Sequence, residues 1–126
     1  MDDYGRTFKG TVVLGAPQNI QVSNYTTVLS DQGKHIFYPG TMGTAGTGRT
    51  WTIDSNANVE YPVGADITFV NQGSGSAGTV SILVDTDTLT LFPSGTSGTR
   101  ILAPYGIATA LKIEATKWLI AGVGIT

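Results

Sequence analysis

The run that comes nearest to a chemical motif is glycine-rich: Gly43 is followed, after four intervening residues, by Gly48-Arg49-Thr50. A phosphate-binding P-loop requires a lysine at the position of Arg49, a strand before the loop and a helix after it. Residues 51–54 instead have the pattern of a strand. We therefore interpret the run as a Gly/Thr loop that places Arg49 at the surface, and not as a nucleotide site.

The carboxylates and the single histidine do not make up a complete metal or catalytic set. Asp85 and Asp87 lie two residues apart, but calcium needs roughly six to eight oxygen ligands and the rest of an EF-hand loop is missing. A site that also recruits Asp54 and Asp66 from distant loops stays open as an alternative. No cysteine is present, so nucleophilic catalysis would need a Ser or Thr activated by His35. We predict no metal, no cofactor and no enzymatic activity.

Aromatic residues beside Gly-rich loops are the candidates for ligand contact, because they offer flat apolar area to a sugar ring. Trp51 and Tyr105 stand in such positions, and Trp118, followed by Leu119 and Ile120, is predicted to lie in the core. The predicted surface ligand contacts are Arg49, Trp51 and Tyr105.

The elements that would position these residues are short strands. Apolar residues recur with period two, and Gly, Pro, Asn and Asp clusters separate the runs. Many strands without crossover helices predict an all-β fold, an antiparallel β-sandwich or jelly-roll-like barrel. The predicted strands are residues 25–29, 34–38, 50–53, 66–70, 79–84, 88–92, 99–103, 107–114 and 117–121.

The start of the chain has a different character. Residues 1–9 mix charges with two aromatics and show no strand period, so a segment of this kind cannot form its own core. We predict an extended N-terminal arm over residues 1–15 and one β domain over residues 16–126. Such an arm is either disordered or laid against another chain, and the arm residues expected to bind that partner are Asp3, Tyr4, Arg6, Phe8 and Lys9.

Composition excludes several function classes. Charged residues make up 13% of the 126 residues, about half of the usual ~25%. A net charge of -2 and a pI near 5.0 argue against nucleic acid as a partner, since phosphate binding needs clustered Lys and Arg. No apolar run approaches the roughly 20 residues of a membrane span, and the acidic start lacks the pattern of a signal peptide. We expect the protein to be made in the cytosol and to leave it only within a larger assembly.

Several segments, taken in order, resemble a β-rich domain that recurs in bacteriophage tail-fibre, receptor-binding and head-decoration proteins. The most specific are Tyr61-Pro62-Val63-Gly64 with the alternating Ile67 and Phe69, and the late spacing of Lys112 and Trp118. The chain departs from the family pattern where Asp54 follows Ile53 in place of a proline, and in a longer Gly/Thr loop. The matching segments are residues 25–34, 51–53, 61–73, 80–82, 88–91, 106–112 and 118–122.

The resemblance implies a virion protein, usually trimeric, that is assembled in the host cytoplasm. A short chain without a shaft favours a homotrimeric capsid decoration (cement) protein, which binds the major capsid protein on the outer face of the shell. The alternative is a tail-fibre or tail-tip module that contacts tail proteins and recognises host surface glycans. The apolar content of residues 101–123 fits a partly buried face between subunits.

Overall fold

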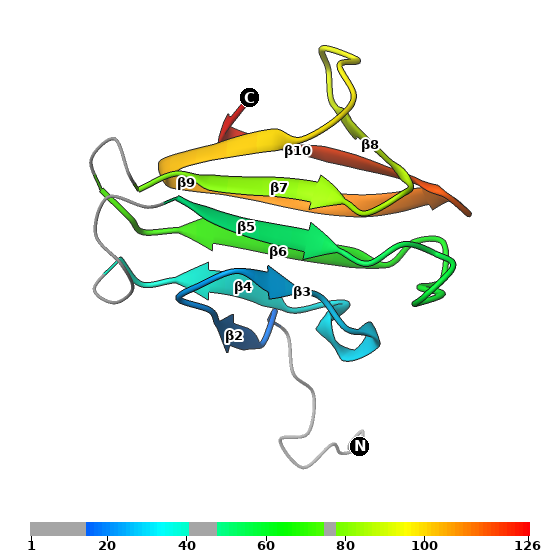
Figure 1. Ribbon diagram of the computed structural model, residues 1–126, viewed down its shortest axis with the longest axis horizontal. Helices are drawn as coiled ribbons and strands as arrows, with labels where there is room; N and C mark the ends of the chain where they lie inside the picture. The colour runs from blue at the N-terminus through cyan, green and yellow to red at the C-terminus, as the bar shows by residue number, and fades with distance from the viewer. Residues whose placement is uncertain (1–14, 41–47, 75–77) are drawn as a thin grey trace, which may run out of the picture.

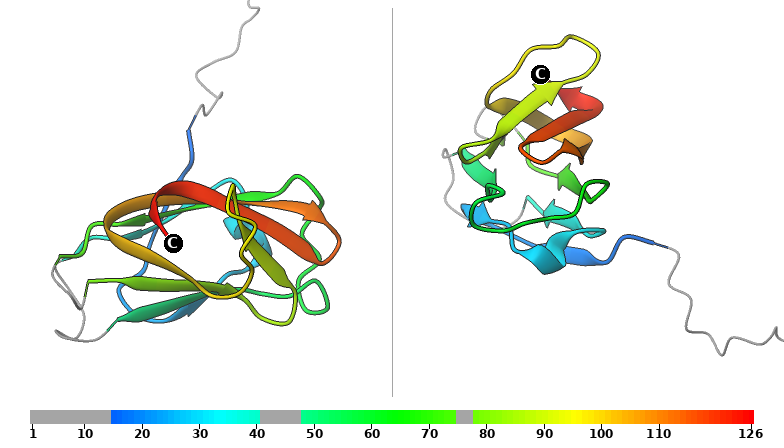
Figure 2. Two further views of the ribbon diagram at one scale, coloured as in Figure 1. Left: turned by 90° about the horizontal axis from the view of Figure 1, so that it is seen from above. Right: turned by 90° about the vertical axis from the view of Figure 1, so that its right-hand side faces the viewer.

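The computed structural model describes residues 15–40, 48–74 and 78–126. Its strands form one curled, half-barrel sheet (Figures 1 and 2), which confirms the all-β prediction. No helix in the described part of the chain is long and apolar enough to span a membrane. The elements are β2 (Gln18–Ile20), β3 (Tyr25–Thr26), the 3₁₀ helix η1 (Leu29–Asp31), β4 (His35–Tyr38), β5 (Arg49–Ile53), β6 (Asp66–Asn71), β7 (Val80–Val84), β8 (Thr88–Leu91), β9 (Arg100–Glu114) and β10 (Lys117–Ile125).

The chain winds alternately between two halves of the sheet, whose strand order is β2-β4-β6-β9-β7-β5-β3. We call β2, β4 and β6 the even wing, and β3, β5 and β7 the odd wing. In Figure 1 the odd wing lies in front of the even wing, and Figure 2 shows the two wings facing each other. Successive strands from β2 to β7 therefore join the even wing and the odd wing in turn.

This winding makes the sheet mixed, so the prediction of an antiparallel sheet is wrong. Neighbouring strands within each wing are parallel, as are β8 and β10. Among the described strands, the antiparallel pairs all involve β9, which pairs with β6, β7 and β10; one isolated antiparallel bridge joins Thr90 to Ser97. Parallel neighbours normally need a crossover helix. Here the opposite wing supplies the crossover, which a strand-by-strand interpretation of the sequence does not anticipate.

Strand β9 joins the two wings. Its first residues pair with β7, and residues 107–111 pair with β6. The two strands predicted at 99–103 and 107–114 are therefore one strand with a bend between the two paired stretches. The strands predicted at 107–114 and 117–121 form an antiparallel hairpin, in which β10 pairs with β9 from Lys117 onward.

The core lies between the inner faces of the two wings. Trp51 of the odd wing stacks on Phe69 of the even wing, with ring centroids 5.8 Å apart. The rings of Tyr61 and Trp118 form a T-shaped pair, with centroids 5.4 Å apart and an interplanar angle of 83°. Inner and outer residues alternate along the strands, so burial of one residue in two drives the wings together.

The turn before β4 is fixed by Asp31, which is 1% exposed. Its Oδ1 accepts a hydrogen bond from Asn19 Nδ2 at 2.9 Å, and its Oδ2 accepts one from the Tyr25 hydroxyl at 2.6 Å and one from the Val28 amide at 2.9 Å. Gly33 follows with a φ of 78°, a left-handed conformation that glycine adopts without steric cost. The strand predicted at 25–29 is shorter than expected, because the chain enters η1 after this contact.

Candidate functional site

Arg49 and Trp51 are not at the surface, and this part of the sequence-based site is wrong. Trp51 is 0% exposed and Arg49 is 6% exposed. Both face inward, since β5 alternates with Thr50 and Thr52 on its outer side. The Arg49 guanidinium lies 3.8 Å from the ring centroid of Tyr38, and its Nε donates to the Val22 carbonyl at 2.9 Å.

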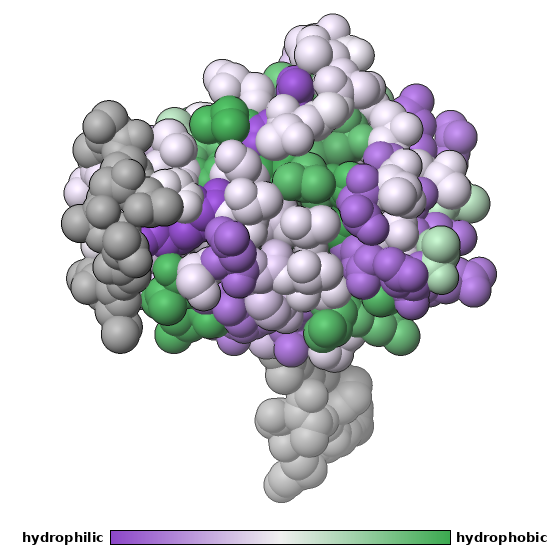
Figure 3. Space-filling view, viewed as in Figure 1, coloured by the Kyte–Doolittle hydropathy of each residue, from purple (hydrophilic) through white to green (hydrophobic). Residues whose placement is uncertain are grey.

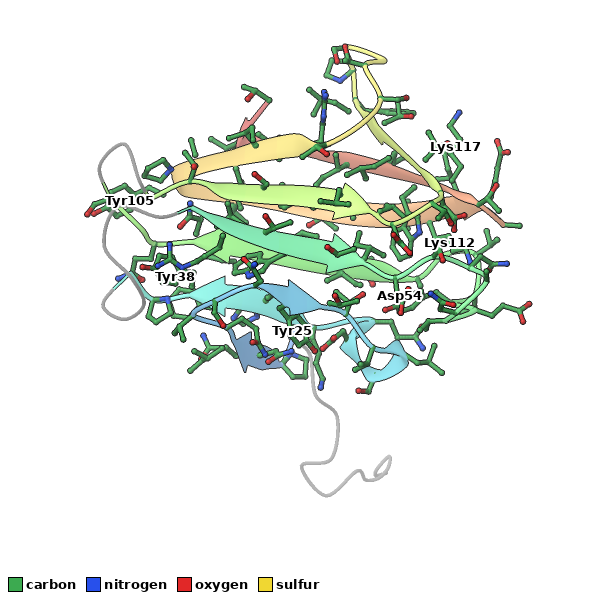
Figure 4. All side chains as sticks on the ribbon, in the orientation of Figure 1. Tyr25, Tyr38, Asp54, Tyr105, Lys112 and Lys117 are labelled. Atoms are coloured by element: carbon green, nitrogen blue, oxygen red, sulfur yellow. The ribbon has the colours of Figure 1, made fainter. Side chains whose placement is uncertain are left out.

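Tyr105 is at the surface as predicted, with 73% of the residue exposed. It lies at the bend of β9, at the end of the molecule opposite Lys112 (Figure 4). Its φ of 62° is left-handed and it is not a glycine. A left-handed residue other than Gly costs about 1–2 kcal/mol, and such costs concentrate at sites that contact ligands or partners. Its predicted role in ligand contact stays a prediction.

Asn71, at the end of β6, holds the bend that carries Tyr105. The residue is 1% exposed. Its Nδ2 donates to the carbonyls of Gly78 at 2.6 Å and of Leu102 and Ala103 at 3.1 Å each. Its Oδ1 accepts from the Gly73 amide at 2.8 Å. One amide group therefore ties the bend of β9 to the connection that follows β6.

A row of apolar side chains crosses the outer face of the even wing and of the β9–β10 hairpin. The strand registers pair each member with the next, from β10 through β9, β6 and β4 to β2. Exposed fractions are 72% for Val123, 48% for Ile107 and 56% for Ile20, and the other two members are half-buried. We name this row the apolar stripe; its members are Val123, Ile107, Val70, Phe37 and Ile20.

The neighbouring row on the same face is polar but uncharged over most of its length. It pairs Ala121, Thr109 and Thr68, and continues to His35 and Gln18. The Thr68 and Thr109 hydroxyls lie 2.9 Å apart. The apolar stripe is therefore bordered by threonines that hydrogen-bond to each other within the chain.

The outer face of the odd wing has a different character. Thr26 pairs with Thr52, which pairs with Leu83, and Thr50 pairs with Ser81. Figure 3 views the molecule from this side, and much of the surface over the odd wing has the pale colour of intermediate hydropathy. The two wings thus share an apolar interior but differ in what they present outward.

The carboxylates do not converge. Asp85 and Asp87 line a recess of about 330 Å³ with Ser97 and Thr99, and Asp87 Oδ2 accepts from the Asn56 amide at 2.7 Å. Within residues 15–40, 48–74 and 78–126, no three His, Asp or Glu side chains gather as a metal site would require. The alternative that brings Asp54 and Asp66 to this pair is therefore not formed there.

His35 forms no catalytic arrangement with Ser30 and Asp31. Its Nδ1 lies 2.8 Å from the Ala16 carbonyl oxygen and its Nε2 lies 3.2 Å from Gln18 Nε2. The Asp31 carboxylate is occupied by Asn19, Tyr25 and Val28, as described above. His35 thus attaches β2 to β4 and does not meet the acidic group.

Lys112 is a buried residue whose role the sequence did not indicate. It is 2% exposed, and its Nζ donates to Asn56 Oδ1 and to the Tyr61 carbonyl, each at 2.7 Å. It is the cross-strand partner of Trp118, which gives the spacing of Lys112 and Trp118 a structural reason. Lys112 lines a recess of about 310 Å³ and fixes residues 56–61 against β9.

The Tyr61 hydroxyl adds a second attachment for the same loop. It lies 2.6 Å from Thr27 Oγ1 and 3.0 Å from the Val28 carbonyl oxygen. Burial of the hydroxyl raises the pKa of Tyr61 to about 12, with smaller contributions from Asp31 and Asp54. Burial, followed by the hydrogen bond to Asp31, also raises the pKa of Tyr25. Both phenols are therefore neutral anchors at physiological pH.

Two sequence predictions concern residues outside those the structure describes. The partner-binding arm residues Asp3, Tyr4, Arg6, Phe8 and Lys9 fall within residues 1–14, and most of the Gly/Thr loop falls within residues 41–47. The residues following Gly48 form β5, where a P-loop would have a helix.

No protein-family model matches the chain, and no curated protein matches it.

Proposed function

We propose that the chain is a non-enzymatic structural protein of a bacteriophage virion, and that it is a trimeric capsid decoration protein bound to the outer face of the shell. One observation carries the proposal. The apolar stripe lies exposed on one outer face, whereas threonine and serine dominate the other. Contiguous exposed apolar rows bordered by polar residues are typical of surfaces that bind other proteins.

The small size of the chain and its low charge both fit association with further copies. A small domain buries a limited share of its surface, and association with further copies adds burial that one copy lacks. In this proposal the domain is jelly-roll-like, three copies associate, and the arm residues Asp3, Tyr4, Arg6, Phe8 and Lys9 contact the major capsid protein. Neither metal nor cofactor takes part.

Binding to undecorated shells tests this function. The purified chain is mixed with shells of its phage, and the bound fraction is measured by sedimentation. We expect saturable binding by the full chain. A variant without residues 1–9 should keep its oligomeric mass and lose shell binding. Full-chain protein that stays in the supernatant at every concentration would contradict the decoration function, and a deletion variant that still binds would contradict the role of the arm.

A tail-fibre or tail-tip module that recognises host glycans is the second candidate, and Tyr105 favours it. An exposed aromatic in a left-handed conformation is suited to stacking on a sugar ring. Binding to host cells, compared between the native chain and Tyr105→Ala, separates the two candidates. Cell binding that depends on Tyr105 supports the tail module, and shell binding without cell binding supports decoration.

A further inference from the structure

We infer that the apolar stripe is the surface through which copies of this chain meet, stripe against stripe. This inference rests on the proposed function and names the partner of its docking face: another copy of the same chain. The argument uses the register, the charge and the size of the stripe.

Register makes the stripe continuous. Val123 faces Ile107 across β10 and β9, and Ile107 faces Val70 across β9 and β6. The row then passes through Phe37 to Ile20 on the edge strand. Strands are spaced by about 4.8 Å, so the stripe runs for about 19 Å. It reaches from β10 at one side of the face to β2 at the other, and no described strand of the same chain covers it.

Charge favours a copy of the chain over an oppositely charged partner. A contact that brings a surface onto the same surface of another copy places like groups near one another, so charged residues there would repel. No residue of the stripe is charged, and Ala121, Thr109 and Thr68 in the adjacent row are uncharged as well. The nearest carboxylate on this face is Asp66, one row further along β6.

Size fits the apolar centre of an interface. The stripe is about 19 Å long and about 7 Å wide, which makes a narrow apolar centre. With the polar row beside it and the row of Asp66 and Leu111, it covers roughly 400 Å² in projection. A standard interface buries about 800 Å² on each partner, with an apolar centre and a polar rim. In the proposed trimer, the stripe of each copy lies toward the three-fold axis, where the three stripes meet and shield one another from water.

A matched pair of substitutions tests the inference. Ile107→Lys places a charge in the stripe, and Leu83→Lys places the same charge at a half-buried outer position of the odd wing. Mass is measured by light scattering over a range of concentrations, with circular dichroism to check the fold. We expect an oligomeric native chain, a dissociation constant raised about tenfold or more by Ile107→Lys, and no change with Leu83→Lys. A native chain that is monomeric at about 100 µM, or equal effects of both substitutions, would overturn the inference.

A second pair keeps the test valid if Ile107→Lys does not fold. Val123 is 72% exposed, so Val123→Lys and Val123→Glu should both fold. Each should dissociate alone, and an equimolar mixture should associate again because unlike charges then meet across the contact. A mixture that stays monomeric would contradict contact of stripe with stripe. Shell binding by an oligomeric native chain is a separate readout, so its absence counts against the proposed function alone.

Discussion

Substitution of the buried Asn71 by alanine should destabilise the domain far more than the same substitution of an exposed asparagine. The Asn71 side chain donates to three carbonyls and accepts from one amide while 1% exposed. Its two amide hydrogens serve three acceptors, so truncation removes about three net hydrogen bonds. The bend of β9 then loses its attachment to the connection that follows β6.

The magnitude follows from burial. A buried hydrogen bond contributes about 1 kcal/mol, and a buried group left without a partner costs about 1–3 kcal/mol. Three lost bonds at the buried Gly73 amide and Gly78 and Leu102 carbonyls and the part-buried Ala103 carbonyl give a loss of about 3–4 kcal/mol in the free energy of unfolding. Asn58→Ala is the control, because its exposed amide donates one bond to Asp54 Oδ1 at 2.9 Å and should cost about 0.5 kcal/mol or less.

Urea unfolding at equilibrium measures the free energy of unfolding of both variants, which are compared at an unchanged slope of that free energy with urea concentration. Hydrogen exchange should also rise at residues 102–106 in Asn71→Ala and not in Asn58→Ala. Equal free energies of unfolding for the two variants would refute the argument that Asn71 secures the bend.

Three further predictions concern pH, strain and packing. The unfolded chain loses the Tyr61 proton near pH 10 and the native chain near 12. The free energy of unfolding should therefore fall as pH rises from 10 to 12, by at most about 2.7 kcal/mol. Urea unfolding measured across this pH range should show a smaller fall for Tyr61→Phe. Tyr105→Asn relieves the left-handed strain, so its thermal unfolding should show stability raised by about 0.5–1 kcal/mol, while an unchanged or lower stability would contradict strain at this residue. Gly122→Ala would bring a methyl group 2.6 Å from Ala108 Cα and should cost about 2–3 kcal/mol; in the same assay Gly95→Ala, which meets nothing within 4 Å, should cost about 1 kcal/mol.

The strands could be predicted because their signal is local. Alternation of inner and outer residues is visible in β5, β6 and β7, and the turn residues Asp31 and Gly33 mark the entry to β4. Within residues 101–123, Ile107 and Val123 lie exposed and paired on one outer face, and the role of this segment between subunits stays a prediction.

The pairing of strands could not be predicted, because it joins segments far apart in the chain. Parallel neighbours such as β4 and β6 are separated by a strand of the opposite wing, and no local pattern records that crossing. The stripe is itself a product of register, since Ile20 and Phe37 become neighbours of Val70 only once β2, β4 and β6 align.

The prediction that Trp51 lies at the surface is wrong because it was based on the neighbouring Gly-rich loop and not on the alternation of β5. Trp51 follows a Gly-rich run, which suggested exposure, but Trp51 and Ile53 share the inner side of β5. The spacing of Lys112 and Trp118 is visible in the sequence, whereas the hydrogen bonds that Lys112 donates to Asn56 Oδ1 and the Tyr61 carbonyl are not. Those partners lie more than fifty residues earlier in the chain.

Electron cryomicroscopy of undecorated shells incubated with the purified chain examines the proposed function and the inferred contact together. We expect clusters of three copies at fixed positions on the outer face of the shell, with Val123, Ile107 and Val70 of each copy enclosed between copies. Shells that carry no added density, or bound copies whose apolar stripe faces solvent, would contradict this expectation.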